Sequence, residues 1–254
     1  MTPGIRVDLA GCTALVTGAS RGLGARFAVT LASAGALVAL CGRDERGLRA
    51  VEQEIEAHGG RAHTFAHDLL DFHRIGALFD RIEAELGPPN VLVNNAATSV
   101  TGRAVEASGV DFDRVFDTNV KAAFFFACET ARRLIARKAS GRVINIASIN
   151  GEQPRVGLAL YCMSKASLIM MTKALAREWA RHGINVNAIL PGAILTDMNR
   201  TIFESEDGRR EVAAMRRRRL MEARDLDGAL LLLAARESSA ITGATLVVDD
   251  AQLP

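Results

Sequence analysis

The sequence predicts one α/β domain, residues 1–254, built on a doubly wound parallel sheet of about seven strands with helices on both faces. Short apolar runs of strand type alternate regularly with longer helical segments, as is typical of parallel strands joined by crossover helices. The strand-like runs are 13–17, 37–41, 62–66, 91–94, 142–147, 184–189 and 244–248. The helical segments are 23–34, 45–58, 70–86, 111–138, 158–182 and 226–235. Such sheets bind ligands beyond the carboxyl ends of their strands, so we expect the site there.

Length and composition agree with one globular domain. The 254 residues suffice for one large core, and no internal repeat, low-complexity stretch or linker divides them. The net charge of +2 favours neither nucleic acid nor an acidic membrane surface as a partner. The N-terminus has no long apolar stretch, and no segment reaches the roughly eighteen apolar residues of a membrane-spanning helix, so neither secretion nor membrane insertion is expected.

The cysteines and histidines do not predict a metal site. The four cysteines lack metal-type spacing and lie in apolar contexts, which predicts reduced thiols in a cytoplasmic protein. His58, His63 and His67 straddle a helix end and a strand, and no carboxylate or cysteine completes a ligand set. We therefore expect no metal.

A glycine-rich turn follows the first strand-like run, 13–17, and precedes a helix. Glycines at such a turn let the backbone approach a pyrophosphate, whose charge the free N–H groups and dipole of the helix start stabilise. The next strand-like run, 37–41, lies at the right distance for a βαβ unit. The turn therefore predicts a dinucleotide site, with candidate residues Gly18, Ser20, Arg21, Gly22, Leu23 and Gly24.

The one tyrosine of the chain, Tyr161, stands four residues before Lys165, and Ser148 stands thirteen residues before Tyr161. On one helix, positions 161 and 165 share a face. A nearby ammonium would lower the pKa of the phenol, which is ordinarily near 10, towards a value useful for proton transfer. A serine ahead of the helix could hold the same substrate oxygen. The trio predicts proton transfer to or from a carbonyl or alcohol oxygen, although Tyr-x3-Lys alone would be weak evidence.

Together these motifs resemble the short-chain dehydrogenase/reductase family, which has a Rossmann-type fold, and the resemblance covers almost the whole chain. Its Thr-Gly-x3-Gly-x-Gly pattern begins here at Thr17, and its Asn-Asn-Ala-Gly pattern is residues 94–97 with alanine last. Further matches are Asn119, Ser148, Tyr161, Lys165, the segment 187–192, Thr196 and the last strand-like run. Asp250 and Ala251 stand where two glycines are usual.

The resemblance implies an oxidoreductase that interconverts a ketone and a secondary alcohol, with four catalytic residues. NADPH would give a hydride to the ketone carbon while Tyr161 gives a proton to its oxygen. Ser148 would hold that oxygen, and Lys165 would lower the phenol pKa and contact the nicotinamide ribose. Asn119 would position a water for proton relay.

The end of the second strand-like run indicates NADP rather than NAD as cofactor. Family members that bind NAD carry a carboxylate there, but this chain has Gly42 followed by Arg43, and Arg21 brings a second cation. Two guanidinium groups suit a 2′-phosphate. Asp44 beside them is a counterargument, and Arg43 could instead face solvent. The resemblance adds further candidate cofactor contacts: Asp68, Leu69, Asn95, Tyr161, Lys165, Pro191, Gly192, Ile194 and Thr196.

The substrate stays open between several ketones. The layout resembles 3-oxoacyl-(acyl-carrier-protein) reductases, and Arg137, Lys138 and Arg181 could offer a basic patch to an acidic carrier protein, or form ordinary surface charge. Sugar, steroid and other secondary-alcohol dehydrogenases share the same motifs, and a cofactor-binding regulator without turnover is a further alternative. Candidate substrate contacts are Ser148, Asn150, Gln153 and Tyr161, with 193–215 as a lid.

A homo-oligomer, expected to be a tetramer, is predicted from the resemblance and from two helical segments, 111–138 and 158–182. Both carry apolar residues over much of their circumference. Phe124, Phe125 and Phe126 are consecutive, so one sheet-facing stripe cannot bury them all.

Overall fold

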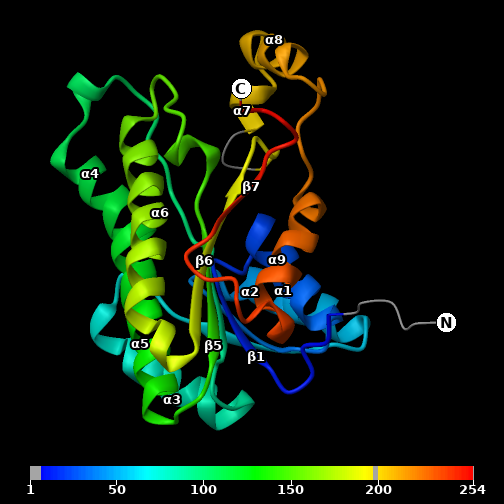
Figure 1. The fold of residues 1–254 in the computed structure, drawn as a ribbon. Helices are drawn as coiled ribbons and strands as arrows, with labels where there is room; N and C mark the ends of the chain where they lie inside the picture. Colours follow the sequence, from blue (N-terminus) through cyan, green and yellow to red (C-terminus); the bar gives the residue numbers. More distant parts are fainter. Residues whose placement is uncertain (1–6, 197–199, 254) are drawn as a thin grey trace.

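Each strand predicted from an apolar run forms in the computed structural model, which describes residues 7–196 and 200–253. In that part of the chain the strands make one parallel sheet in the order β3-β2-β1-β4-β5-β6-β7 (Figure 1), which confirms the predicted fold class. The strands are β1 (Thr13–Thr17), β2 (Leu37–Gly42), β3 (Arg61–Ala66), β4 (Val91–Asn94), β5 (Gly141–Ile146), β6 (Ile184–Pro191) and β7 (Thr245–Val248). β1, β4, β5 and β6 are buried along their whole length, as expected for strands covered on both faces.

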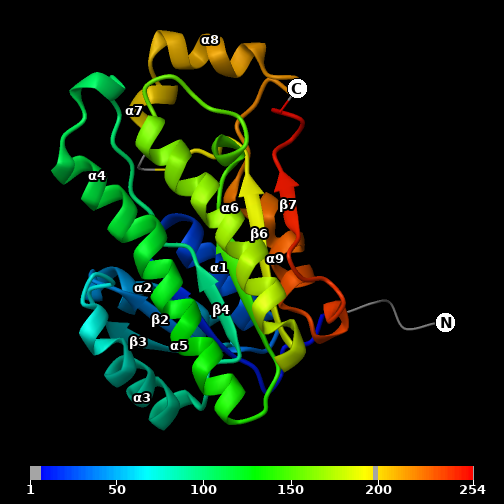
Figure 2. The same ribbon diagram turned by 60° about the vertical axis from the view of Figure 1, so that its left-hand side comes forward.

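Helices cover both faces of the sheet. One face packs against α1 (Gly22–Ser33), α2 (Glu45–Ala57) and α9 (Asp227–Ala234), and the other against α3 (Ile75–Leu86), α5 (Ala122–Ala136) and α6 (Ala159–Trp179). Figures 1 and 2 show these two layers on opposite sides of the strands. The strand order reverses between β1 and β4, and this switch point is where doubly wound sheets bind ligands.

The helical segment predicted at 111–138 is not one continuous helix. It consists of α4 (Gly109–Phe116), a π-helical turn at Asp117–Lys121 and α5. Ser108 and Asp111 form a capping box that starts α4. The side chain of Asn119 in the π-helical turn is hydrogen-bonded to neighbouring segments, and this anchoring accompanies the change in helical pitch.

Two short helices that the sequence analysis did not predict lie in segment 193–215. They are α7 (Arg200–Phe203) and α8 (Glu206–Ala214), and Ser205 caps α8 by accepting a hydrogen bond from the Gly208 N–H. Figure 2 shows both beyond the carboxyl ends of β6 and β7. The lid predicted over 193–215 stays a prediction, and residues 197–199 of that segment lie outside the described residues.

Candidate active site

A cavity of about 1400 Å³ opens at the carboxyl ends of the central strands. Single-ligand pockets usually measure roughly 300–1,000 Å³, so this cavity has room for a dinucleotide and a second small molecule. All candidate site residues except Asn119 line it: Gly18, Ser20, Arg21, Gly22, Leu23, Gly24, Arg43, Asp68, Leu69, Asn95, Ser148, Asn150, Gln153, Tyr161, Lys165, Pro191, Gly192, Ile194 and Thr196. The fold therefore gathers nearly every residue that the sequence analysis selected.

The glycine-rich turn between β1 and α1 is closely packed around two of its glycines, Gly18 and Gly24. A Cβ atom at Gly24 would lie 2.1 Å from the carbonyl oxygen of Gly18, and Gly18 itself has a φ of 66°. The Asn95 amide donates to the carbonyl oxygens of Thr17 at 3.0 Å and Gly18 at 3.3 Å. Asn95 therefore holds the turn from the end of β4, in addition to lining the cavity where a cofactor contact was expected. This tight backbone cradle fits the pyrophosphate of a dinucleotide.

The end of β2 presents one carboxylate, Asp44, beside two cations that line the cavity. Arg21 and Arg43 are both exposed and line it. Asp44 also lines the cavity, but its side chain caps α2 by accepting a hydrogen bond from the Gly47 N–H at 3.1 Å. A Cβ atom at Gly42 would meet only Leu48, at 3.7 Å, so the position has space for a side chain. The local charge therefore suits an anion such as a 2′-phosphate.

Tyr161 and Lys165 lie side by side on α6, as their spacing predicted. The Lys165 ammonium lies 5.6 Å from the centre of the Tyr161 ring and donates a hydrogen bond to the Ile146 carbonyl at 2.7 Å. Ser148 follows β5 and its hydroxyl accepts a hydrogen bond from the Asn150 N–H at 3.1 Å. These three polar groups are thus held between β5 and α6 at one wall of the cavity.

The pKa of the phenol does not shift in the direction expected from sequence. Burial raises the pKa of Tyr161 to about 12, and its hydrogen bond with Ser148 offsets only part of this increase. Burial also lowers the pKa of Lys165 to about 7, because the 2 % exposed ammonium has little contact with water. The prediction of a lowered phenol pKa is therefore wrong for this structure, because burial outweighs the hydrogen bond with Ser148. At neutral pH Tyr161 is protonated, which is the form that can donate a proton.

Asn119 is fully buried and does not line the cavity. Its side-chain nitrogen donates to the Thr98 carbonyl and to the Ser164 hydroxyl, both at 2.9 Å, and its side-chain oxygen accepts from the Thr98 N–H at 2.8 Å. Both amide hydrogens are thereby used. The side chain thus connects the segment after β4 to α6. Because both amide hydrogens are used, a relay water could bind only to the second lone pair of the side-chain oxygen or to the backbone.

The C-terminal turn closes the cavity beside β6. The Gln252 side-chain oxygen accepts a hydrogen bond from the Ala193 N–H at 2.6 Å, and a Cβ atom at Gly192 would clash with it. Asp250 and Ala251 both have positive φ, 57° and 59°, the conformation that two glycines would adopt at low cost. Asp250 is held by ion pairs with Arg217 at 3.0 Å and Arg219 at 2.8 Å.

Two sets of contacts near the site were not predicted from the sequence. Asn94 donates to the Asn145 side-chain oxygen at 2.9 Å, and Asn145 donates to the Thr172 hydroxyl at 2.8 Å, which ties β4, β5 and α6 together. The sequence signal for these contacts was the presence of an asparagine in each of two mostly apolar strands, β4 and β5. Arg155 and Glu211 form an ion pair of 2.6 Å inside the cavity lining, and no sequence pattern links residues 56 positions apart.

The chain belongs to the short chain dehydrogenase family, whose model matches residues 12–207. It is 36% identical over 247 residues to the gluconate 5-dehydrogenase of Gluconobacter oxydans, covering 95% of this chain and 94% of that one. It is 35% identical over 244 residues to the 3-oxoacyl-(acyl-carrier-protein) reductase of Escherichia coli, covering 96% and 98%. A crystal structure of a gluconate 5-dehydrogenase from Burkholderia cenocepacia in complex with NADP and tartrate superimposes with a TM-score of 0.91, at 31% identity and 96% coverage of each chain.

The family assignment confirms the sequence resemblance and the expectation of an oxidoreductase acting on alcohol and carbonyl groups. Among the described residues no helix is both long and apolar enough to cross a membrane.

Proposed function

We propose that the protein is an NADP-dependent oxidoreductase that interconverts a ketone and a secondary alcohol, with Tyr161 as the acid and base. The observation that supports this most directly is the wall formed by Ser148, Tyr161 and Lys165 in a cavity that also contains the glycine cradle. A cofactor-binding regulator without turnover would have no need for a buried phenol beside a buried ammonium. Among relatives, the matched dehydrogenases and reductases favour turnover as well.

The residues would divide the reaction as follows. Bound NADPH would supply a hydride. Tyr161, protonated at neutral pH, would donate its proton to the substrate oxygen, and the Ser148 hydroxyl would hold that oxygen during the transfer. Lys165 would stabilise the phenolate that remains and would contact the nicotinamide ribose. Asn119 would support the proton relay by holding the end of β4 against α6.

NADP is favoured over NAD because of the charge at the end of β2. Arg21 and Arg43 line the cavity there, Gly42 provides no carboxylate, and Asp44 is engaged in capping α2. Solved relatives also carry NADP. Each charge-assisted contact to a 2′-phosphate contributes about 1.5–3 kcal/mol, so two contacts would give a preference of roughly a hundredfold or more.

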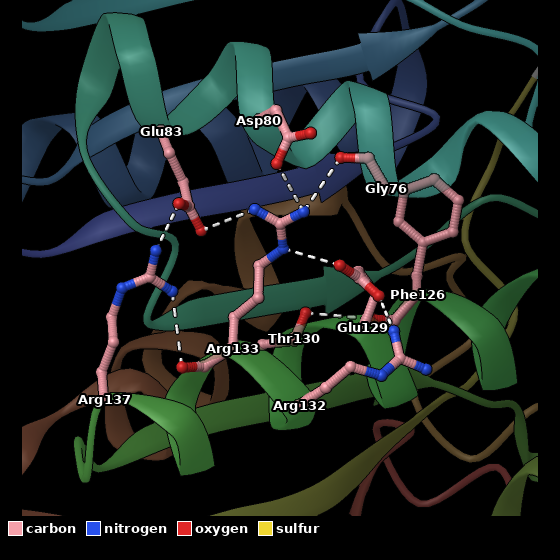
Figure 3. Close-up of polar contacts among 9 residues, drawn as sticks. All are labelled: Gly76, Asp80, Glu83, Phe126, Glu129, Thr130, Arg132, Arg133 and Arg137. Atoms are coloured by element: carbon pink, nitrogen blue, oxygen red, sulfur yellow. Dashed lines mark hydrogen bonds and ion pairs between the residues drawn. The ribbon is translucent and has the colours of Figure 1, made fainter.

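Two substrate classes have specific support. Gluconate 5-dehydrogenases favour a sugar acid, and the 3-oxoacyl-(acyl-carrier-protein) reductase at 35% identity favours a 3-oxoacyl thioester. The carrier-protein patch proposed from sequence has less free charge than its residues imply, because Arg137 forms an ion pair with Glu83 (Figure 3). A steroid or another secondary alcohol has no comparable support, so we rank the sugar acid first.

The assembly and surroundings of the protein form part of the same proposal. Phe124 and Phe125 on α5 are 39 % and 41 % exposed, so this face suits a homotetramer contact. The chain forms one cofactor-binding domain, with 193–215 as its lid. All four cysteines are free, which agrees with a reducing cytoplasm. Light scattering at micromolar concentration would test the tetramer, and a monomeric mass would contradict it.

The proposal is tested by a panel of ketones and alcohols, with NADPH oxidation or NADP reduction followed by absorbance. Wild type should turn over at least one member with a kcat/KM for the NADP form well above that for the NAD form. Tyr161→Phe should lose on the order of a hundredfold or more in turnover while still binding NADPH. Binding of NADPH without turnover of any ketone or alcohol in the panel would favour the hypothesis of a cofactor-binding regulator.

The cofactor preference has its own control. Gly42→Asp with Arg43→Ala should reverse much of the preference, because it removes one attraction and adds one repulsion in a position that has space for the side chain. Equal kcat/KM for the two cofactors in wild type would contradict the NADP assignment and leave the Tyr161 chemistry intact.

A further inference from the structure

The part of the cavity beyond Ser148 and Tyr161 combines apolar side chains, such as Phe203 and Met215, with polar groups. Five lining residues carry hydroxyl or amide groups: Ser99, Thr101, Thr118, Asn150 and Gln153. Three charged residues also line the cavity, Arg114, Arg155 and Glu211. These polar and charged groups would give a small, hydroxyl-bearing molecule hydrogen-bond partners that a wholly apolar pocket lacks.

Arg155 lies in the short connection between the two catalytic segments. This connection runs from Ser148 to the start of α6, and its backbone is fixed at both ends. The Gln153 N–H donates to the Ile149 carbonyl at 2.8 Å, and the Leu158 N–H donates to the Arg155 carbonyl at 3.1 Å. Arg155 is therefore attached firmly to the elements that carry Ser148 and Tyr161.

The side chain of Arg155 reaches the opposite wall of the cavity. Its guanidinium carbon lies 5.6 Å from the centre of the Phe203 ring, and its Nη2 donates to a carboxylate oxygen of Glu211 on α8 at 2.6 Å. The side chain is 33 % exposed. Among the described residues this is its one side-chain hydrogen bond, and a guanidinium has five N–H donors. Several donors thus stay available in a side chain whose plane is already oriented by a ring and a carboxylate.

The other arginine of this region is arranged differently. Arg114 lies on α4, its side chain is 56 % exposed, and it pairs at 3.4 Å with Asp111 one turn away on the same helix. It therefore belongs to the rim of the cavity. Arg155 is the better oriented of the two for binding an anion in the interior.

We propose that the Arg155 guanidinium binds a carboxylate of the substrate, so that the enzyme selects small hydroxy and oxo acids over neutral polyols and over thioesters. The inference rests on the proposed function and specifies its substrate class. Guanidinium groups bind carboxylates through paired hydrogen bonds, which fixes orientation as well as affinity. Glu211 and Phe203 hold the guanidinium in place from the lid side, so lid position and substrate binding are coupled through one side chain.

The test compares gluconate with glucitol, which has the same chain of hydroxyl groups but a neutral CH2OH in place of the carboxylate. A 3-oxoacyl thioester of N-acetylcysteamine is the third substrate. Wild type should have its highest kcat/KM for the acid. Arg155→Gln should raise KM for gluconate by roughly tenfold to a hundredfold, as expected for a lost charged hydrogen bond, and should leave glucitol nearly unchanged. Arg155→Lys should recover part of the loss.

Two controls separate charge recognition from damage to the lid. Glu211→Gln removes the negative charge but keeps a side-chain oxygen that can accept the hydrogen bond from Arg155, so the guanidinium stays oriented and gluconate KM should stay the same or fall. Arg103→Gln changes an exposed arginine outside the cavity lining and should have no effect. A rise in gluconate KM in Glu211→Gln equal to that in Arg155→Gln would overturn the proposal, because it would show a structural role.

A binding measurement makes the result independent of catalysis. Calorimetry with gluconate and the NADP complex of Tyr161→Phe should show binding, and adding Arg155→Gln should weaken it at least tenfold. Equal wild-type preference for glucitol, or preference for the thioester, would overturn this inference while the proposed oxidoreductase stands. Absence of turnover with every carbonyl and alcohol tested would instead remove the proposed function itself.

Discussion

Two cations on neighbouring helices, Lys165 on α6 and Arg133 on α5, are held in opposite ways. Lys165 is 2 % exposed and, among the described residues, its one hydrogen bond is to the Ile146 carbonyl. The Arg133 side chain is 18 % exposed and lies within 3.0 Å of three carboxylates and one backbone carbonyl: Glu129, Asp80, Glu83 and Gly76. Figure 3 shows this cluster between α3 and α5.

The two environments move the pKa values in opposite directions. Burial lowers the pKa of Arg133, but hydrogen bonds with Asp80 and Glu83 outweigh it, so its pKa is raised overall. Burial lowers the pKa of Lys165 to about 7, and no carboxylate of the described residues opposes this shift. Arg133 joins α3 to α5, and the carboxylates of these two helices balance its charge. A cation without a carboxylate, placed in a cavity, destabilises the fold and is retained where its charge serves a ligand or a reaction.

Lys165→Met should give the largest effect on activity. It removes the ammonium next to Tyr161, so kcat/KM should fall on the order of a hundredfold or more, and NADPH affinity measured by fluorescence should fall too. The free energy of unfolding at pH 7 should stay the same or rise, because the variant no longer buries an unpaired amine. Unchanged NADPH affinity with reduced turnover would remove the ribose contact from the proposal.

Arg133→Met should have the converse result, with normal kcat/KM and lower stability. The change leaves Glu129 and Glu83 short of a partner, although Arg132 and Arg137 still contact them, so we expect a loss of about 2 kcal/mol in the free energy of unfolding. Arg137→Met is the matched control: its side chain is 40 % exposed and has one carboxylate partner, so the loss should stay below about 1 kcal/mol. Equal losses in urea unfolding would show that burial does not distinguish the two arginines.

The pH dependence of stability sharpens the same comparison. The pKa of Lys165 is about 7 in the folded state and near its ordinary 10.5 in the unfolded chain. Between these values the unfolded chain binds the extra proton, so the stability of wild type rises with pH relative to Lys165→Met, by at most about 1.4 kcal/mol per pH unit. Below pH 7 both states carry the proton and the difference should level off. A difference between the two proteins that does not change from pH 7.5 to 8.5 would mean that Lys165 keeps its charge when folded.

Local pattern and motif spacing were sufficient to predict much of this molecule. The apolar runs predicted every strand within a few residues, because buried parallel strands are short and apolar throughout. Tyr161 and Lys165 could be paired because helical spacing alone places them on one face. The glycines at 18 and 24 were recognisable because close backbone packing excludes any side chain there.

The remaining features depend on contacts between distant segments. The change of helical pitch at Asn119 is accompanied by hydrogen bonds to Thr98 and Ser164, and the ion pair of Arg155 with Glu211 joins a loop to α8. The direction of the Tyr161 pKa shift was mispredicted because the sequence shows which charges are near but not how deeply a group is buried.

We expect the smallest changes in stability at the C-terminal turn, where one carboxylate, Asp250, pairs with two exposed arginines. Ala251 has a φ of 59° and is exposed, so Ala251→Gly relieves left-handed backbone strain. Glycine also makes the unfolded chain more flexible, which offsets part of this gain. The free energy of unfolding should therefore rise by roughly 0.5–1 kcal/mol.

Asp250→Gly relieves the same strain but removes the ion pairs with Arg217 and Arg219, whose side chains are 66 % and 43 % exposed. The Asp250 side chain itself is only 9 % exposed, but solvent around the two arginines screens both pairs. Such screened pairs contribute about 0–1 kcal/mol each, so the two effects should nearly cancel. Urea unfolding of both variants measures the difference. If Asp250→Gly stabilises as much as Ala251→Gly, these ion pairs contribute nothing. A loss of about 2 kcal/mol in Asp250→Gly would mean that these ion pairs stabilise the fold as much as the Arg133 cluster does. The exposed fraction of the arginine side chains would then not determine how much an ion pair contributes to stability.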